Sequence, residues 1–290
     1  MKLSIIILTN GKDNIITRCL TSIFEKTSKL TLEQIEILIG YNGKNDIIFN
    51  TLNNFNSCVK CIKHDEYQFS ANCNDLAKRA TGDVLLFLND DVELLDDVIT
   101  YALNILEDDV EDKIGAIGLK LLYPNGNIQH YGHRLMISNT GDFLGINHYL
   151  LNNKNINTSD IYAVGVTGAF LMIKTKIFKQ FGMFNEKYKK CFEDAELCLK
   201  LTSHNKLNIC IGVSHAIHYE SFTRKSSVVN NNISCDENES DKIKKLKNAD
   251  KYVLPDDKTL IRDYYNNNKY NILKNKILYG NTILTFKPKK

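Results

Sequence analysis

Residues 82–91 read Gly82-Asp83-Val84-Leu85-Leu86-Phe87-Leu88-Asn89-Asp90-Asp91, an apolar run that ends in three polar residues. A short continuous apolar run is typical of a parallel strand that is buried on both faces. Residues 3–8 form a second such run, and Thr9-Asn10-Gly11 follow it. Ligands of open α/β sheets bind beyond the carboxyl ends of the strands, so these two polar clusters mark the expected site.

Strand-like and helix-like segments alternate over the first 120 residues. Alternating β and α elements with short connections predict an α/β fold with a mostly parallel central sheet flanked by helices. The predicted strands cover 3–8, 35–39, 58–62, 84–88 and 114–119, and the predicted helices cover 15–24, 71–80 and 98–106.

The pattern changes after residue 120. Pro124-Asn125-Gly126-Asn127 is a turn signal between two strand-like pieces, which predicts a small antiparallel hairpin within 121–137. Residues 139–160 are polar and Asn-rich, which predicts a mobile loop. A strand over 165–173 and a helix over 193–201 are expected to follow.

We expect one domain over residues 1–225. The remainder, 226–290, is rich in Asn, Lys and Asp and is predicted to be a polar extension that is partly helical or disordered. Weak helix signals lie near Leu246 and Tyr264.

The charge balance gives no support for a nucleic-acid partner. Thirty-seven Lys and Arg residues stand against 34 Asp and Glu residues, which leaves a net charge of +3 in 290 residues. No apolar run approaches the ~20 residues that span a bilayer. Asn10, Lys12 and Asp13 interrupt the N-terminal run too early for a signal peptide. We therefore expect a cytoplasmic protein without a transmembrane segment.

The eight cysteines show no repeated spacing and predict free thiols in a reducing compartment. Cys58 and Cys61 form one C-x-x-C pair. A structural zinc site usually needs a second pair, which the sequence lacks.

Asn89-Asp90-Asp91 allow two interpretations. Adjacent carboxylates at the end of a buried strand repel each other unless a cation neutralises them, and their hard oxygen atoms suit Mg²⁺ or Mn²⁺ with substrate phosphates. Asn and Asp are also favoured caps of a following helix. The residues alone do not separate these interpretations.

Two further polar clusters lie downstream. Glu193, Asp194 and Glu196 fall in the first turn of a predicted helix, where the helix dipole favours acidic residues and where one carboxylate could act as a general base. His218 and Arg224 could serve a metal–diphosphate group, although a lone histidine is often structural. The sequence contains neither a P-loop nor a G-x-G-x-x-G motif.

The order of the motifs resembles that of the family-2 inverting glycosyltransferases with the nucleotide-sugar-binding GT-A fold, and most of all the rhamnosyltransferase-like and polysaccharide-building enzymes. The resemblance covers residue 3 to about residue 225. The matching stretches are residues 4–10, Phe69-Ser70, Asn74, residues 80–91, residues 121–132, Thr167-Gly168-Ala169, residues 182–186, Phe192-Glu193-Asp194 and residues 218–224.

The resemblance implies a role for each matching residue. Asp91 would hold a divalent ion, Mn²⁺ or Mg²⁺, on the donor diphosphate, and His218 would join that metal shell. Asp194, with Glu193 as the less favoured choice, would be the catalytic base. Asn89 stands where the family's metal motif usually has its first aspartate. The remaining donor-binding positions would be Thr9, Asn10, Asn74, Asn89, Asp90, Gly168, Ala169 and Arg224.

Tyr41 departs from the family pattern, since an aspartate that helps to recognise the pyrimidine usually follows the second strand. Tyrosine offers a hydroxyl and a ring face but no carboxylate. We therefore expect relaxed base selection, with Asn42 or Asp46 holding the ribose.

The expected reaction is a single displacement, metal-assisted and inverting, that moves a sugar from a UDP- or dTDP-linked donor to a hydroxyl group of a glycan or glycoconjugate acceptor. A nucleotidyltransferase and a non-catalytic glycan-binding relic of the fold are the alternatives. The sequence leaves open whether the chain forms a homodimer.

Overall fold

The structure is a computed structural model, and it describes residues 1–11, 15–138, 143–148, 159–188, 192–219, 262–269 and 283–286. The helices are α1 (Ile15–Lys26), α2 (Lys29–Leu32), α3 (Asp46–Asn53), α4 (Phe69–Arg79), α5 (Val98–Asp108), α6 (Thr175–Gln180), α7 (Glu193–Ser203) and a helix over 262–269. The strands are β1 (Leu3–Thr9), β2 (Ile35–Tyr41), β3 (Val59–Lys63), β4 (Val84–Asn89), β5 (Val92–Leu94), β6 (Ile114–Leu122), β7 (Ile128–His130), β8 (His133–Ser138), β9 (Phe143–His148), β10 (Ile161–Ala163), β11 (Phe170–Lys174), β12 (Leu207–His218) and β13 (Ile283–Phe286).

The main sheet grows from β1, in which all seven residues are buried. β1 pairs in parallel with β2 and β4, and β2 pairs in parallel with β3. The full order is β10-β12-β6-β11-β4-β1-β2-β3, with β5 paired to β12 and β7 to β6. β6 and β12 are again parallel, while β11 runs antiparallel between β4 and β6. The predicted α/β class and its central parallel sheet are confirmed.

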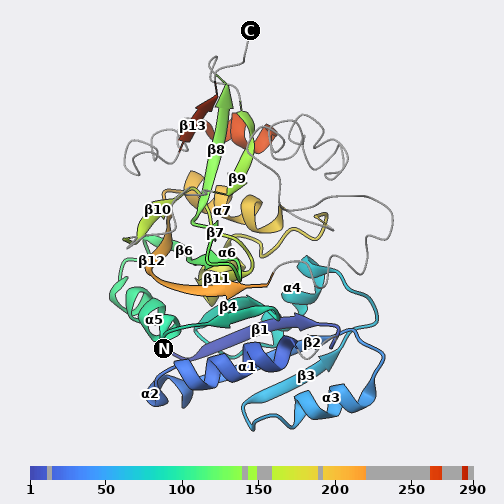
Figure 1. Cartoon of the computed structure of the whole chain (residues 1–290). Coiled ribbons are helices and arrows are strands. Elements are labelled where there is room, and N and C mark those ends of the chain that lie inside the picture. Colours follow the sequence, from blue (N-terminus) through green and yellow to red (C-terminus); the bar gives the residue numbers. More distant parts are fainter. Residues whose placement is uncertain are drawn as a thin grey trace.

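Helices cover both faces of this sheet (Figure 1). Because side chains alternate along a strand, Ile5 and Ile7 pack into one apolar layer with α1 and α5. Ile6 and Leu8 pack into the other layer, with α4, α6 and α7. The carboxyl ends of the parallel strands stay uncovered by these layers, and the candidate site lies there.

A hairpin and a second sheet rise above the main sheet. β6 and β7 pair antiparallel across the predicted turn, so the hairpin is confirmed. β8 lies between β9 and β13 in a three-stranded sheet, which Figure 1 shows extending away from the main sheet. The predicted loop over 139–160 is therefore wrong for residues 143–148. These residues become a strand through antiparallel pairing with β8, which the local composition does not reveal.

The strand predicted over 165–173 begins later, at Phe170. Residues 167–169 form a turn in which Phe170 N–H donates to the Thr167 carbonyl oxygen at 3.3 Å. The backbone of this turn contacts the candidate site, as described below.

The helix over 262–269 packs against residues of β8 and α7. Tyr265, in the helix over 262–269, is fully buried with Leu135, Val164 and Leu199. The predicted helix near Tyr264 is thus confirmed, and the Tyr264 hydroxyl lies 2.5 Å from Ser203 Oγ. The helix signal near Leu246 falls outside the described residues.

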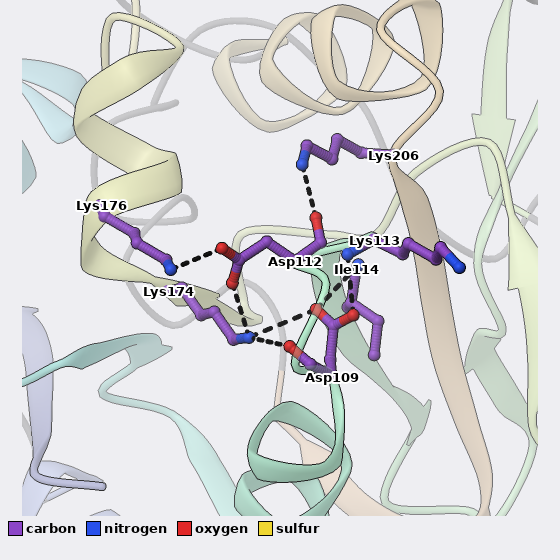
Figure 2. A network of polar contacts seen from close by, with 7 residues as sticks. All are labelled: Asp109, Asp112, Lys113, Ile114, Lys174, Lys176 and Lys206. Carbon is purple, nitrogen blue, oxygen red and sulfur yellow. Dashed lines mark hydrogen bonds and ion pairs between the residues drawn. The ribbon is translucent and has the colours of Figure 1, made fainter.

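A charged network lies at the end of the main sheet where β6 and β12 begin (Figure 2). Lys174, at the end of β11, is 4% exposed and lies 2.8 Å from Asp112 Oδ1 and 3.4 Å from Asp109 Oδ2. Lys176 approaches the other Asp112 oxygen at 2.5 Å, and Lys206 donates to the Asp112 carbonyl oxygen. The network connects the segments at the start of β6, α6 and β12. It therefore lies far from the carboxyl ends of β6 and β12.

Candidate active site

The end of β4 and the end of β12 bring the central residues of the site together. β4 ends at Asn89, Asp90 and Asp91 turn the chain, and β5 then pairs antiparallel with β12. In this pairing His218 lies opposite Val92, the neighbour of Asp91. The backbone N–H of Tyr219 also donates to the Asp91 carbonyl oxygen at 3.0 Å, which fixes the two segments to each other.

An irregularity in β12 sets this register. Ile211 pairs with Leu119, but the next β12 residue to pair, His215, lies opposite Lys120. The three intervening residues bulge, and Asp160 Oδ1 accepts the N–H groups of Gly212 and Val213 at 2.9 and 3.3 Å. The buried ammonium group of Lys120 donates to the Gly212 carbonyl oxygen at 2.6 Å. The bulge is therefore hydrogen-bonded, and it determines which β12 residue reaches Asp91.

His218 Nε2 and Asp91 Oδ1 face each other at 3.1 Å, and both side chains are buried. His218 Nδ1 lies 2.7 Å from Gln129 Oε1, which can only accept, so Nδ1 carries the proton. The Asn89 amide nitrogen also lies near this ring nitrogen, 3.2 Å from Nε2. Nε2 is thus the ring nitrogen that faces the Asp91 carboxylate, and among the described residues no hydrogen-bond donor other than His218 approaches Asp91 Oδ1.

This arrangement fits a divalent cation. Two adjacent ligands of an octahedral ion, each about 2.1 Å from it, lie about 3.0 Å apart. The separation of Asp91 Oδ1 and His218 Nε2 matches that spacing, and one carboxylate with one imidazole is a donor set that Mn²⁺ accepts.

Asp90 adds a second carboxylate to the same turn. Burial, together with the negative charge of Asp91, raises the pKa of Asp90 to about 6, although a hydrogen bond from the Thr9 hydroxyl opposes the shift. The Thr9 oxygen also accepts the Gly11 N–H at 3.1 Å. Among the described residues, no lysine or arginine forms an ion pair with Asp90 or Asp91, and His218 is the basic side chain in contact with Asp91. The turn therefore concentrates negative charge.

Asp194 lies at the start of α7 and is held by two backbone groups. Its Oδ2 accepts the Gly168 N–H at 2.8 Å, and its Oδ1 accepts the Ala195 N–H at 2.7 Å. The next turn residue, Ala169, accepts the Asn89 N–H at 3.0 Å. The turn of residues 167–169 thus connects the end of β4 to Asp194, while Glu193 is buried in the helix.

A pocket of about 930 Å³ lies between the loops that follow β1 and β2. Asn10, Asn42 and Asp46 line it, together with Tyr41. The Tyr41 ring occupies the space where a Cβ on Gly11 or Gly43 would lie, within 2.8 and 2.4 Å of ring or hydroxyl atoms. Gly11 also has a φ of +72°, so a larger residue there would be both strained and obstructed.

Tyr41 is 1% exposed, and its hydroxyl is used within its own loop. It donates to the Asn45 carbonyl oxygen at 2.9 Å and accepts the Asn45 N–H at 3.2 Å. By contrast, no donor among the described residues hydrogen-bonds the buried Asn42 Oδ1. Asn42 also lines the pocket, so its amide is a candidate contact that the engaged Tyr41 hydroxyl is not.

Asn74 lies on α4 and braces the fold. Its amide nitrogen donates to the Phe184 carbonyl oxygen at 2.8 Å and to Glu186 Oε1 at 3.1 Å. Both amide hydrogens are used in this way, which gives no support to the expected donor contact. Arg224 lies outside the described residues.

The sequence interpretation assigned no role to Gln129 or to the imidazoles beside it. Ring nitrogens of His130, His133 and His148 lie within 4.8 Å of one another. His130 Nε2 accepts the N–H groups of Gly132 and Thr167 at 3.2 and 3.3 Å, so its Nδ1 carries the proton and donates to His148 Nδ1 at 2.7 Å. Burial and the neighbouring imidazoles hold the pKa of His130 well below its usual value. These contacts make His130 a neutral support of the 167–169 turn.

The sequence model of the glycosyl transferase family 2 matches residues 4–182, which include Asn89-Asp90-Asp91 and the 167–169 turn. The chain belongs to glycosyl transferase family 2. The family that the motif order indicated is thereby confirmed.

Curated relatives agree with this family. The O-antigen biosynthesis protein RfbC of Myxococcus xanthus is 30% identical over 177 residues, which are 59% of this chain and 14% of the relative. The uncharacterized protein y4gI of Sinorhizobium fredii is 27% identical over 234 residues, 76% of this chain and 25% of the relative. This chain therefore spans a quarter or less of the length of these relatives.

Solved structures share the fold at low sequence identity. GalNAc-T7 with UDP, GalNAc and Mn²⁺ gives a TM-score of 0.61 at 15% identity, covering 75% of this chain and 44% of that one. S. aureus TarS 1-349 with UDP-GlcNAc gives 0.52 at 17% identity, covering 76% and 61%. The mannosyltransferase PcManGT of Pyrobaculum calidifontis with GDP-Man and Mn²⁺ gives 0.55 at 11% identity, covering 96% and 76%. The expected GT-A fold is confirmed. Among the described residues, no helix is both long and apolar enough to pass through a bilayer.

Proposed function

We propose that this chain transfers a sugar from a nucleoside diphosphate donor, UDP- or dTDP-linked, to a hydroxyl group of a glycan acceptor by a metal-assisted single displacement that inverts the anomeric carbon. The observation that carries the proposal is the approach of Asp91 Oδ1 to His218 Nε2 at 3.1 Å at the end of β4, with Gln129 holding the other ring nitrogen of His218.

Asp91 and His218 would hold Mn²⁺ or Mg²⁺. When bound, such an ion neutralises the charge that grows on the departing diphosphate. The carboxylate of Asp90 adds negative potential to the same turn and favours a cation there. The solved structures of GalNAc-T7 and PcManGT contain Mn²⁺, which supports this choice of ion.

Asp194 is proposed as the general base. Its two backbone hydrogen bonds hold the carboxylate in one orientation, from which it would take the proton of the attacking hydroxyl group. The Gly168 N–H that orients Asp194 belongs to the same turn as Ala169, which contacts Asn89, so the base and the metal ligands are positioned by one rigid segment.

The pocket formed by Asn10, Asn42 and Asp46 would hold the nucleoside. Its place beside the carboxyl ends of β1 and β2 is where open α/β sheets bind nucleotides. UDP in the GalNAc-T7 and TarS structures supports a uridine donor, and the RfbC relative, an O-antigen biosynthesis protein, supports a glycan acceptor. The free cysteines Cys19, Cys58, Cys61, Cys73, Cys198 and Cys210 suit a reducing compartment, and we propose that the protein acts in the cytoplasm.

The test is slow donor hydrolysis without an acceptor. The full chain is incubated with UDP-, dTDP- and GDP-sugars in Mn²⁺ or in EDTA, and the released nucleotide is identified. Release of a nucleoside diphosphate in Mn²⁺ but not in EDTA is expected, and ¹H NMR of the fresh sugar should show inversion. Release of a nucleoside monophosphate would indicate the alternative nucleotidyltransferase. Binding of glycans with no donor turnover would indicate the glycan-binding relic.

A further inference from the structure

Gln129 is the one residue of β7 that the β6–β7 ladder skips. Leu121 pairs with His130 and Leu122 pairs with Ile128, so Gln129 falls at the register shift between them. Such bulges turn a side chain away from the direction that regular pairing would give it. Here the side chain is 7% exposed and ends at the His218 imidazole, on a different strand.

The contact leaves little freedom in the state of His218. Gln129 Oε1 lies 2.7 Å from His218 Nδ1, and a carbonyl oxygen accepts only a donated proton. On the other side of the ring, Nε2 lies 3.1 Å from Asp91 Oδ1 and 3.2 Å from the Asn89 amide nitrogen. Gln129 therefore keeps a proton on Nδ1, and Nε2 is the ring nitrogen that faces Asp91.

We propose that Gln129 is a positioning residue that fixes the tautomer and ring orientation of His218 so that Nε2 is available to a divalent cation. The inference rests on the proposed function for the identity of the ligand, but not for the tautomer. Partners on the second ring nitrogen of a metal-binding histidine typically contribute a factor of 10–100 to metal affinity. A carbonyl acceptor buried on a β-bulge holds the ring without adding a charge to the site.

Two substitutions separate positioning from packing. Gln129→Leu removes the acceptor and keeps most of the volume, whereas Gln129→Glu keeps an oxygen acceptor at the same place. Ile128→Val, a small packing loss at the neighbouring buried position in β7, is the matched control for stability. Thermal unfolding is measured for all three variants.

The metal-free readout is the tautomer itself. Long-range ¹H–¹⁵N correlation spectra of the ¹⁵N-histidine-labelled wild-type protein, with His218→Gln to assign the signals, should show a protonated Nδ1 of His218. Gln129→Leu should mix the two tautomers, and Gln129→Glu should restore the wild-type pattern. A neutral His218 with its proton on Nε2 and none on Nδ1 in the wild-type protein would overturn the proposal even if every variant failed to fold.

The second readout is the Kd of Mn²⁺ in the presence of saturating UDP, measured by calorimetry or by the free Mn²⁺ signal in electron paramagnetic resonance. Gln129→Leu should weaken binding about 10–100-fold, Ile128→Val should stay within about threefold of wild type, and Gln129→Glu, which adds a negative charge, should bind at least as tightly as wild type. Equal affinity of folded wild type and Gln129→Leu would refute the role of Gln129. Absence of Mn²⁺ binding by the wild type would instead refute the proposed function, and the tautomer spectra would still decide on Gln129.

Discussion

His218 Nε2 and Asp91 Oδ1 lie 3.1 Å apart in a buried site. With a proton on Nε2 the two side chains form an ion pair, and without it both atoms can act as ligands of one divalent cation. The fold maintains this contact by pairing β5 with β12 and by binding the Tyr219 N–H to the Asp91 carbonyl oxygen.

Removing the carboxylate should affect metal binding more than folding. Asp91→Ala is expected to abolish turnover and to weaken UDP binding in Mn²⁺, while the protein remains folded. Calorimetric titration with UDP, with and without Mn²⁺, and thermal unfolding measure the two effects. Full wild-type turnover in EDTA would contradict this assignment.

Asp194→Asn should reduce turnover by a factor of about 10²–10⁴, the usual effect of losing a general base. The amide keeps the size of the side chain and one oxygen that can accept the Gly168 N–H, so donor affinity should remain near that of the wild type. Steady-state kinetics with UDP titration separates the two quantities. Glu193→Gln is the matched control, and an inactive Glu193→Gln beside an active Asp194→Asn would exchange their roles.

Base selection should be relaxed, because the position of the usual aspartate is taken by Tyr41, whose hydroxyl is bound to the backbone of Asn45. UDP and dTDP should bind in Mn²⁺ with similar affinity. Titration with UDP, dTDP and GDP measures this. A preference for UDP over dTDP beyond about 100-fold, roughly 2.7 kcal/mol, would show that another group, with Asn42 as the first candidate, selects the base.

The neutral state of His130 should make stability depend on pH. Burial lowers the pKa of His130 in the folded protein below the unfolded value of about 6.5, so the unfolded chain binds a proton that the folded chain does not. The free energy of unfolding should then fall as the pH drops below about 6.5, by up to ~1.4 kcal/mol per pH unit. His130→Gln lacks this component, and the raised pKa of Asp90 acts in both proteins and cancels in the comparison. Denaturant unfolding from pH 7.5 to 5.5 checks the prediction, which parallel curves for the two proteins would contradict.

The network of Figure 2 predicts a large effect on stability without an effect on chemistry. Lys174→Met leaves the buried Asp109 carboxylate without its cation and should cost about 3–5 kcal/mol in unfolding free energy. Lys176→Met removes a lysine whose side chain is 66% exposed from the same network and should cost at most about 1 kcal/mol. Turnover per folded molecule should be unchanged in both variants, since the network lies at the amino ends of β6 and β12, away from the site. A loss of turnover per folded molecule would count against that separation.

The sequence predicted those parts of the fold that depend on local pattern. β1, β2 and β4 are continuous apolar runs because both their faces are buried, and such runs are visible without a structure. β9 was missed because it becomes a strand only through its pairing with β8. The antiparallel insertion of β11 between β4 and β6 is equally a property of the assembled sheet.

The site was predictable to a similar extent. Asp90 and Asp91 could be singled out from two carboxylates at a strand end, whereas His218 and Asp194 received their roles from the motif order. Gln129 carried no signal of its own, because its contact with His218 depends on a bulge in a three-residue strand. The engagement of the Tyr41 hydroxyl with Asn45 likewise depends on the conformation of the loop after β2.

The bulge in β12 constrains the number of residues between Ile211 and His215 as tightly as the identity of the site residues. Successive strand residues point to opposite faces of a sheet, so deleting or inserting one residue between Ile211 and His215 would send the following side chains to the wrong face. His218 would then turn away from Asp91 although every residue of the site was still present. Natural or engineered variation in length should therefore be tolerated in the surface loops of this chain but not across residues 212–214.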